Sequence, residues 1–259
     1  GTVLAAGSGV TEFAEGDRVA WIGVLGTYAG LAVTPAAAAV PLPDGLDDRL
    51  AAASLLQGMT AHYLTTASYP VREGDTVLVH AAAGGTGLLI TQLAKARGGR
   101  VIGTVSTQAK EEQARAAGAD EVIRYTEVDD LAAKVRELTG GDGVAVVYDG
   151  VGRDTFDASL ASLRRRGTVV VFGASSGPVP PVDLQRLNAA GSVFVTRPKL
   201  TDHVATRDEL CWRAAEVLSM VRDGTLKIVI GGEYSLADAR RAHEELQSRR
   251  TTGKLLILP

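Results

Sequence analysis

The sequence predicts an α/β protein in which a doubly wound parallel sheet occupies most of the chain. Six short apolar runs rich in Val and Ile follow one another between Thr76 and Arg197. Helical patterns separate the earlier runs from one another, and a glycine-rich loop follows the run that begins at Thr76. Alternation of this kind is typical of a parallel sheet covered by helices on both faces. Six strands in this rhythm favour a nucleotide-binding architecture.

The segment before the sheet is predicted to be a small β-rich module. Short strands joined by glycine turns are expected in VLAAGSGV (3–10), GDRVAWIGV (16–24) and YAGLAVT (28–34). PLPDGL (41–46) marks a joint, because proline and glycine interrupt regular structure. Apolar residues at helical spacing then predict a helix over residues 47–66.

The elements of the sheet and of the C-terminal segment follow in order. Strands are predicted in residues 76–83, 100–106, 121–125, 144–152, 167–177 and 191–197. Helices are predicted over residues 88–98, 109–118 and 129–141, the last with Asp129 or Asp130 as its N-cap. After these come a helix (210–222), a strand (226–230), a helix with Ser235 as N-cap (235–249) and a strand (255–258). We therefore expect three parts, 1–60, 61–226 and 227–259.

Composition excludes several classes of protein. The chain has 259 residues, 46% apolar and 22% charged, with a net charge of −3, which excludes a disordered chain. No Lys/Arg-rich block stands out, so nucleic acid is not an expected partner, and no apolar run reaches the length of a membrane span. The single cysteine, Cys211, excludes an internal disulfide and fits a reducing compartment, the cytoplasm. No histidine pair has metal-ligand spacing, so we expect no metal.

The glycine-rich loop gives the strongest functional signal. In HAAAGGTGLL the predicted strand leads into Gly84, Gly85, Thr86 and Gly87, and a helix follows at once. In the dinucleotide-binding pattern G-x-G-x-x-G the first glycine position is Ala82 here, and the others are Gly84 and Gly87. Gly84 lets the backbone approach a pyrophosphate, Gly87 allows close helix–strand packing, and the helix N-terminus attracts the phosphate charge. A tight turn that binds no ligand is the alternative.

The end of the next strand predicts NADPH rather than NADH. Sites for NAD usually carry Asp or Glu there, which binds the ribose hydroxyls. The sequence instead has Ser106 and Thr107, with Lys110 in the following helix and Tyr125 at the end of the neighbouring strand. Hydroxyls and a cation suit a 2′-phosphate. Lys110 could also be an ordinary solvated charge beside Glu111, so the missing carboxylate is the firmer part of the argument.

Other candidate residues follow the later strands, at the edge where open α/β sheets bind ligands. They are Asp149–Gly152, Phe172–Gly177 and Thr196–Arg197. Each glycine cluster alone would be interpreted as a turn, but several clusters on one edge favour a long ligand. The sequence has no G-x-S-x-G motif, and GASSG lacks a histidine base that could activate its serines.

Nine segments in this order resemble one known family: GDRVAW, QGMTAHYL, HAAAGGTGLLITQLAKARG, RVIGTVS, GADEVIRY, VVYDGVGRDTF, LRRRGTVVVFGASSG, GSVFVTRP and AHEELQSRRTTGKLLI. Together they resemble the bacterial NADPH:quinone oxidoreductases, the zinc-free, zeta-crystallin-like branch of the medium-chain dehydrogenase/reductases. The resemblance covers essentially the whole chain. It implies a Rossmann domain plus the remnant of a GroES-like β-rich catalytic domain, to which the C-terminal segment returns. Gly1 matches a point inside the usual chain, so we expect an N-terminal segment to be missing.

The resemblance also implies roles for individual residues. It places Gly85 and Thr86 at the pyrophosphate, and it agrees with Ser106, Lys110 and Tyr125 at the 2′-phosphate. The remaining implied cofactor contacts are Thr60, Tyr63, Gly150, Phe172, Gly173, Ala174, Ser175, Val195, Thr196, Arg197 and Arg249. Gln57 stands where zinc-dependent relatives have a ligand cysteine, and the Cys-rich zinc lobe is absent, so the resemblance implies no zinc.

The implied activity is hydride transfer from NADPH to a quinone or conjugated carbonyl, with no protein side chain assigned as catalytic. An enoyl or enone reductase of the same superfamily and a truncated, non-catalytic NADPH-binding protein are the alternatives. A methyltransferase is disfavoured, because a SAM ribose normally binds an acid near Ser106. By resemblance we expect a homodimer, in which the sixth strand (192–196) pairs across a two-fold axis and covers exposed Val193, Phe194 and Val195.

Overall fold

The computed structural model describes residues 1–248 and 251–259. It divides into two compact units, one formed by Gly1–Thr60 with His203–Pro259 and the other by Ala61–Asp202. The second boundary thus lies at residue 202, where the sequence led us to expect 226. Helix α7 (Arg207–Arg222) belongs with the first unit because it packs on α1 (Asp48–Tyr63) at Gly58. A Cβ atom at Gly58 would lie 2.4 Å from Cγ1 of Val217, so glycine is what permits this contact.

The unit Ala61–Asp202 contains a six-stranded sheet in the order β5-β4-β3-β6-β7-β8, and all neighbouring strands are parallel. Its strands are β3 (Thr76–Val79), β4 (Arg100–Val105), β5 (Glu121–Arg124), β6 (Val144–Asp149), β7 (Leu163–Val171) and β8 (Phe194–Thr196). The predicted doubly wound sheet is confirmed. Strand order reverses direction at β3, and such a switch point is where open α/β sheets bind ligands.

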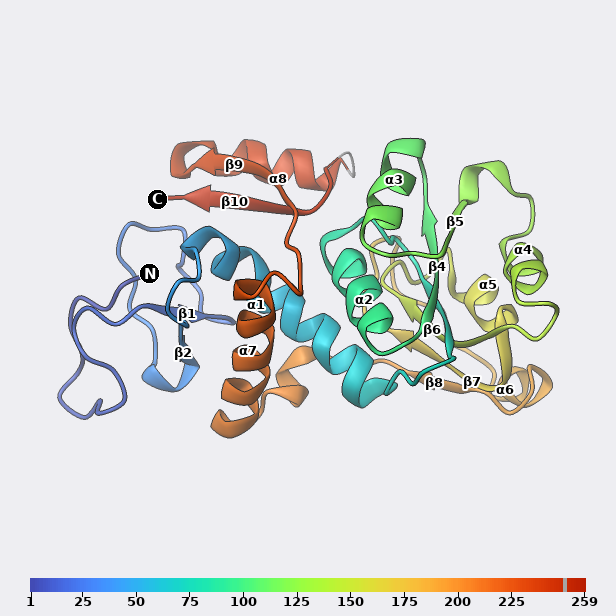
Figure 1. The fold of residues 1–259 in the computed structure, drawn as a ribbon, viewed down its shortest axis with the longest axis horizontal. Coiled ribbons are helices and arrows are strands. Elements are labelled where there is room, and N and C mark those ends of the chain that lie inside the picture. The colour runs from blue at the N-terminus through green and yellow to red at the C-terminus, as the bar shows by residue number, and fades with distance from the viewer. Residues whose placement is uncertain (249–250) are drawn as a thin grey trace. The chain divides into compact units, whose positions relative to one another are not determined.

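Helices cover both faces of this sheet. Helices α2 (Gly85–Ala96) and α3 (Gln108–Ala116) lie on one face, and α4 (Leu131–Leu138) and α5 (Phe156–Ala161) lie together on the other (Figure 1). Asp130 is the N-cap of α4, since its carboxylate accepts the Ala133 amide at 2.9 Å. Burial on two faces explains why β6 is buried along its whole length. Helices α5 and α6 (Gln185–Ala189) were not predicted.

The core of this unit lies between the central strands and the α4–α5 face. Leu78, Ile102 and Val147, from three adjacent strands, are each completely buried. Val135 of α4 and Phe156 of α5 complete the same cluster from above the sheet. Packing of this kind fixes the strand ends, and those ends carry the candidate site.

The N-terminal part of the other unit has less β-structure than predicted. Strand β1 (Val19–Trp21) pairs antiparallel with β2 (Ala39–Pro41), a strand that the sequence did not indicate. The strands expected at 3–10 and 28–34 are wrong, and residues 1–40 hold one further bridge, between Thr2 and Arg18. Glycine is dense in this part, and positive φ angles at positions such as Gly16 turn the chain before a ladder can extend.

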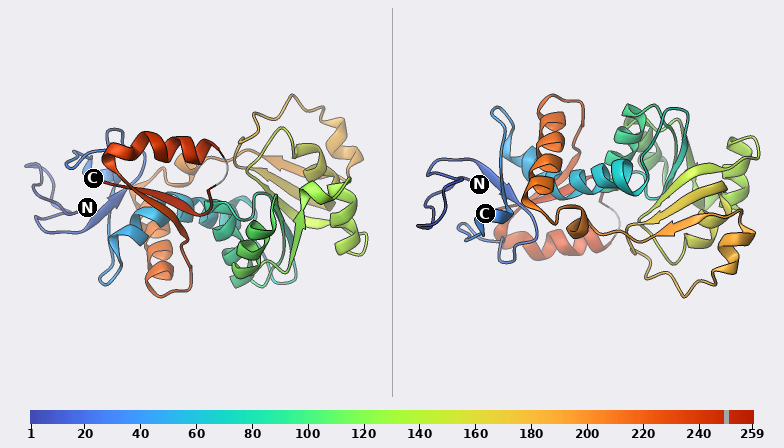
Figure 2. Two further views of the ribbon diagram at one scale, coloured as in Figure 1. Left: turned by 90° about the horizontal axis from the view of Figure 1, so that it is seen from above. Right: turned by 90° about the horizontal axis from the view of Figure 1, so that it is seen from below.

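The C-terminal part of that unit is a parallel strand–helix–strand motif. Strands β9 (Ile230–Ser235) and β10 (Lys254–Leu258) pair directly, and α8 (Ala239–Gln247) packs on both, as Figure 2 shows in red. The strand predicted at 226–230 is wrong, because β9 begins at its last residue. Ser235 caps a short 3₁₀ turn that leads into α8. Among the described residues, no helix is both long and apolar enough to span a membrane.

Candidate nucleotide-binding site

The loop between β3 and α2 has the geometry of a phosphate-binding turn. Gly84 is the N-cap of α2, and its amide donates to the Ala81 carbonyl at 2.8 Å. The first hydrogen bond of the helix runs from the Leu88 amide to the Gly84 carbonyl. The amides of Gly85, Thr86 and Gly87 therefore have no acceptor within the helix. Amides in this position at a helix N-terminus are able to bind an anion.

Close packing explains two of the small residues of this loop. A Cβ atom at Gly87 would lie 2.3 Å from the Ala81 carbonyl oxygen, so only glycine fits there. Ala82, at the first glycine position of the motif, is completely buried, and a Cβ at Gly103 of β4 would lie 2.8 Å from its methyl group. Sequence reasoning did not single out Gly103, although a glycine inside a strand indicates a close approach. Ala81 has a φ of 51°, a left-handed conformation that costs an alanine energy.

The structure brings the three predicted 2′-phosphate residues to one corner of the sheet. Ser106 follows β4 and is half-buried, as is Lys110 in the first turn of α3. The Thr126 hydroxyl donates to the Ser106 carbonyl at 3.3 Å, which ties the residue after Tyr125 to the end of β4. Thr107 caps α3 by accepting the Lys110 amide at 3.4 Å.

Glu111, the acidic neighbour of Lys110, forms ion pairs with two arginines. Glu111 pairs with Arg115 at 3.0 Å and with Arg124 at 3.1 Å. Tyr125 is 49% exposed at the end of β5. This corner therefore offers two hydroxyl groups and a cation, and no carboxylate stands at the end of β4.

The loops after β6 and β7 pack glycine against glycine. A Cβ at Gly150 would lie 2.8 Å from the Phe172 ring, and a Cβ at Gly173 would lie 2.4 Å from the Gly150 carbonyl oxygen. The Phe172 amide donates to the Asp149 carbonyl at 2.9 Å, and the Ser175 amide to the Gly150 carbonyl at 3.3 Å. The structure thus brings Gly150 together with the predicted segment Phe172–Ser175.

A buried hydrogen-bond network supports these loops from below, and sequence reasoning missed it. The Asp149 carboxylate accepts the amides of Val151 and Gly152 at 2.8 and 2.9 Å. Its other oxygen accepts the Ser159 hydroxyl at 2.8 Å, which lies 2.9 Å from Nε2 of His80. Nδ1 of His80 lies 3.0 Å from the Thr104 hydroxyl, so the network joins the ends of β3, β4 and β6.

Both ring nitrogens of His80 have hydrogen-bond partners in this arrangement. Burial lowers its pKa below the ordinary value of 6.5, against the opposing effect of the Asp149 charge. The imidazole is therefore neutral near pH 7, one nitrogen donating and the other accepting. The described residues contain no group of three His, Cys, Asp or Glu side chains arranged to bind a metal.

The remaining predicted contacts lie at β8 and at the end of α1. Val195 and Thr196 pair with Val169 and Val170 of β7, and Arg197 follows the strand. Tyr63 is buried, and burial raises the pKa of its phenol to about 12, with the Arg197 charge acting in the opposite direction. That electrostatic effect indicates that Tyr63 and Arg197 lie near each other.

The last two predicted residues are Thr60 and Arg249. Thr60 belongs to the other unit, where its hydroxyl donates to the Leu56 carbonyl at 2.8 Å. Arg249 lies outside the described residues. The prediction that Val193 is exposed is wrong, because this side chain is buried in the core, whereas Phe194 and Val195 are 61% and 38% exposed.

Comparisons with known proteins agree with this geometry. Residues 85–205 match a family model described as zinc-binding dehydrogenase. The quinone oxidoreductase of Salmonella typhimurium is 45% identical over 262 residues, covering 100% of this chain and 80% of the relative. A mycobacterial protein solved in complex with NADPH gives a TM-score of 0.96 at 53% identity. The Escherichia coli quinone oxidoreductase, also solved with NADPH, gives a TM-score of 0.96 at 45% identity.

The two solved structures cover 100% of this chain, which in turn covers 80% of each of them. The match therefore includes both compact units as well as the phosphate-binding loop. Relatives of this identity over this length establish the family. The chain belongs to the quinone oxidoreductases of the medium-chain dehydrogenase/reductase superfamily.

Proposed function

We propose that the chain is an NADPH-dependent quinone reductase that needs no zinc. The observation that carries this proposal is the carboxyl edge of the sheet. There the anion-binding amides of Gly85, Thr86 and Gly87 share one edge with a corner that offers hydroxyls and a cation. Two members of the family were solved with NADPH, which supports the same cofactor here.

The residues fit NADPH in a specific way. Gly84–Gly87 would hold the pyrophosphate, because the amides of Gly85, Thr86 and Gly87 lie at the N-terminus of α2 and have no acceptor within the helix. Ser106, Lys110 and Tyr125 would hold the 2′-phosphate through hydroxyls and charge. The nicotinamide half would lie along Tyr63, Gly150, Phe172–Ser175 and Val195–Arg197, with Thr60 and Arg249 as further contacts. When bound, NADPH supplies the hydride that reduces the quinone.

The side chains at this edge bind and orient; we assign none of them as an acid or base. Tyr63, with a pKa of about 12, keeps its proton at neutral pH, so its phenol can donate or accept a hydrogen bond. A quinone accepts electrons readily, so a proton from solvent completes its reduction. Positioning of the two reactants and exclusion of water are then the protein's contribution.

Three further features belong to the proposal. Zinc independence is supported by Gln57 and by the single cysteine, Cys211, which leaves no Cys-rich zinc lobe. A free cysteine fits the reducing cytoplasm. A homodimer through β8 would cover an edge strand that pairs on one side with β7. Gly1–Thr60 would represent part of a GroES-like catalytic domain, with the C-terminal segment returning to it.

The decisive experiment is a fluorescence titration of the purified chain with NADPH and with NADH, followed by 1,4-benzoquinone in the same cuvette. We expect NADPH to bind at least tenfold more tightly and to be oxidised by the quinone. NADPH binding without reduction of either the quinone or a conjugated enone would contradict the reductase and favour a non-catalytic NADPH-binding protein. Oxidation by the enone alone would favour the enone reductase alternative.

A further inference from the structure

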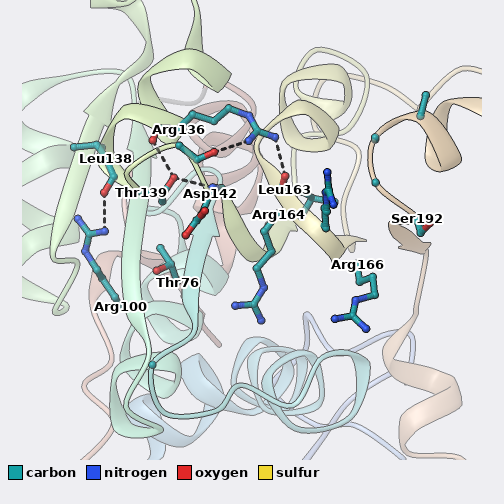
Figure 3. Close-up of a pocket in the computed structure, with 17 residues that line it drawn as sticks. Thr76, Arg100, Arg136, Leu138, Thr139, Asp142, Leu163, Arg164, Arg166 and Ser192 are labelled. Carbon is teal, nitrogen blue, oxygen red and sulfur yellow. Dashed lines mark hydrogen bonds between the residues drawn. The ribbon is translucent and has the colours of Figure 1, made fainter.

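A cavity that the proposed function does not use lies at the amino ends of the strands, at the end of the sheet opposite the proposed cofactor site. Its volume is ≈ 1060 Å³, at the upper end of small-molecule sites, which span about 300–1,000 Å³. It opens at the amino ends of the strands, among Thr76 of β3, Arg100 of β4, Leu163 of β7 and Ser192 before β8 (Figure 3). Its whole lining comes from the unit Ala61–Asp202.

Arginine dominates the charge of this cavity. Arg100, Arg136, Arg164, Arg165 and Arg166 line it. The one acidic side chain in the lining is Asp142. The lining thus has a formal charge of +4, whereas the whole chain has a net charge of −3. A concentration of positive charge inside a cavity, on a protein that is slightly acidic, favours a bound anion.

Two of the five arginines have structural roles. Arg136 donates to the carbonyls of Ala161, Gly141 and Leu163 at 2.9–3.0 Å, which fixes the loop between α4 and β6. Arg100 donates to the Leu138 carbonyl at 2.8 Å at the C-terminal end of α4. The carbonyl partners of Arg136 are neutral and leave its charge in place. Arg100 also pairs with the Glu121 carboxylate at 3.7 Å, which offsets part of its charge.

The other three arginines form one run in an irregular part of β7. Pairing moves from Val144 to Val146 on β6, while it moves from Leu163 to Thr168 on β7. The intervening residues bulge out of the ladder, and bulges of this kind redirect side chains. Figure 3 shows the guanidinium groups of Arg164 and Arg166 extending to the same side.

The arginines of this bulge differ in their partners. Arg164 pairs with the buried Asp75 carboxylate at 3.0 Å. The side chains of Arg165 and Arg166 make no hydrogen bond or ion pair with the residues that the structure describes. Arg166 also has a φ of 58°, a conformation that costs a non-glycine residue energy, while its amide donates to the Gly191 carbonyl at 2.9 Å.

We propose that this arginine-lined cavity binds a phosphorylated small molecule with two or more negative charges, at a site separate from the cofactor edge. One guanidinium group can donate two parallel hydrogen bonds to the oxygens of one phosphate group. The side-chain donors of Arg165 and Arg166 are available for such bonds. The volume accommodates a ligand of nucleotide size. The shared chemistry is a chain of phosphoryl groups, whether free or attached to a nucleoside.

Calorimetric titration with tripolyphosphate and, separately, with ATP tests the proposal. The double variant R165Q/R166N removes both uncommitted charges, and asparagine tolerates the left-handed backbone at position 166. We expect it to bind tripolyphosphate at least tenfold more weakly, a loss of about 1.4 kcal/mol or more. The matched control R222Q/R240Q removes two exposed charges elsewhere, and K110A removes the cation of the cofactor edge. Both should bind tripolyphosphate as the unmodified chain does.

The outcomes separate the explanations. Equal affinities for ATP and tripolyphosphate would show that a free phosphate chain is sufficient for binding. A higher affinity for ATP would show that the site recognises a nucleotide. Either result supports the proposal. Equal weakening in R222Q/R240Q, weakening confined to K110A, or no binding at all would overturn it. A changed sedimentation coefficient of R165Q/R166N with unchanged tripolyphosphate affinity would also overturn it, since the arginines would then serve a subunit contact. If the double variant does not fold, R165Q alone, which leaves the backbone at Arg166 intact, gives the same comparison.

Discussion

At the scale of single residues, we expect cofactor selectivity to depend on the corner after β4. Replacing Lys110 with alanine removes the cation that would face the 2′-phosphate. A hydrogen bond to a charged group is worth about 1.5–3 kcal/mol, so we expect NADPH to bind at least tenfold more weakly. NADH lacks that phosphate, and its affinity should stay the same. Fluorescence titration with both cofactors measures the difference.

The control for this prediction is Lys134→Ala. Lys134 lies on α4 and pairs with Glu137 at 2.7 Å, so the variant removes a helical lysine from another surface. It should change neither affinity. If Lys110→Ala weakened NADPH and NADH equally, the lysine would support the fold of α3 rather than recognise the phosphate.

His80 gives a second prediction at this scale, in the pH dependence of stability. Its pKa is lowered by burial from 6.5, so the unfolded chain takes up a proton below about pH 6.5 while the folded chain does not. The free energy of unfolding should therefore fall as pH decreases from 6.5, by at most about 1.4 kcal/mol per pH unit for one proton. In urea unfolding between pH 5 and 8, the free energy of unfolding of His80→Gln should lack this contribution to its dependence on pH.

Ser159→Ala is the matched variant, because it interrupts the same network without removing the titrating group. It should lower the stability at every pH by about 1–3 kcal/mol, since a buried partner is left unsatisfied. It should keep the slope of the unmodified chain, because burial is the main cause of the lowered pKa. A His80→Gln variant with an unchanged slope would show that other groups cause the pH dependence.

At the scale of elements, the loop between β3 and α2 makes opposite predictions for two neighbouring positions. Ala81→Gly relieves a left-handed alanine and should change stability by about 0–1 kcal/mol in the favourable direction. Gly87→Ala places a methyl group 2.3 Å from the Ala81 carbonyl oxygen and should destabilise by about 1–3 kcal/mol. Gly30→Ala, with nothing within 4 Å, is the control in urea unfolding. Equal effects of Gly87→Ala and Gly30→Ala would mean that the loop relaxes freely.

The central sheet could be predicted from sequence because its strands are local apolar runs, and inner strands such as β3 and β6 are almost completely buried. Strand β9 could not be predicted, because Gly231 and Gly232 look like turn residues. They instead lie inside β9, where a Cβ at Gly231 would approach the Thr252 carbonyl oxygen within 1.8 Å. That reason for glycine is tertiary, and no local pattern carries it.

The candidate site shows the same limit. Gly84, Gly87 and Ser106 were found from one short motif and the strand that follows it. The network of Asp149, Ser159 and His80 joins residues far apart in sequence, and the arginine cavity joins Arg100 to Arg166. Both depend on which strands become neighbours in the sheet, so neither leaves a continuous signal in the chain.

At the scale of the whole molecule, the two ends of the sheet have different chemistry. The carboxyl ends carry closely packed glycines, whereas the amino ends carry arginines. Strand β7 runs from the arginine bulge at one end to Phe172 and Gly173 at the other. The two proposed sites therefore share one strand, although their ligands would be recognised by different groups.

The exposed edge of this sheet leads to a prediction about assembly. Strand β8 pairs with β7 on one side, and Phe194 on it is 61% exposed. Pairing of β8 with its copy across a two-fold axis would cover that side chain and remove the open strand edge. Phe194→Lys places a charge in this contact, so we expect sedimentation velocity to show a dimer for the unmodified chain and a monomer for the variant. Leu184→Lys, which replaces a side chain that is 73% exposed elsewhere in the same unit, should remain dimeric. If both variants sediment like the unmodified chain, β8 is not the subunit interface.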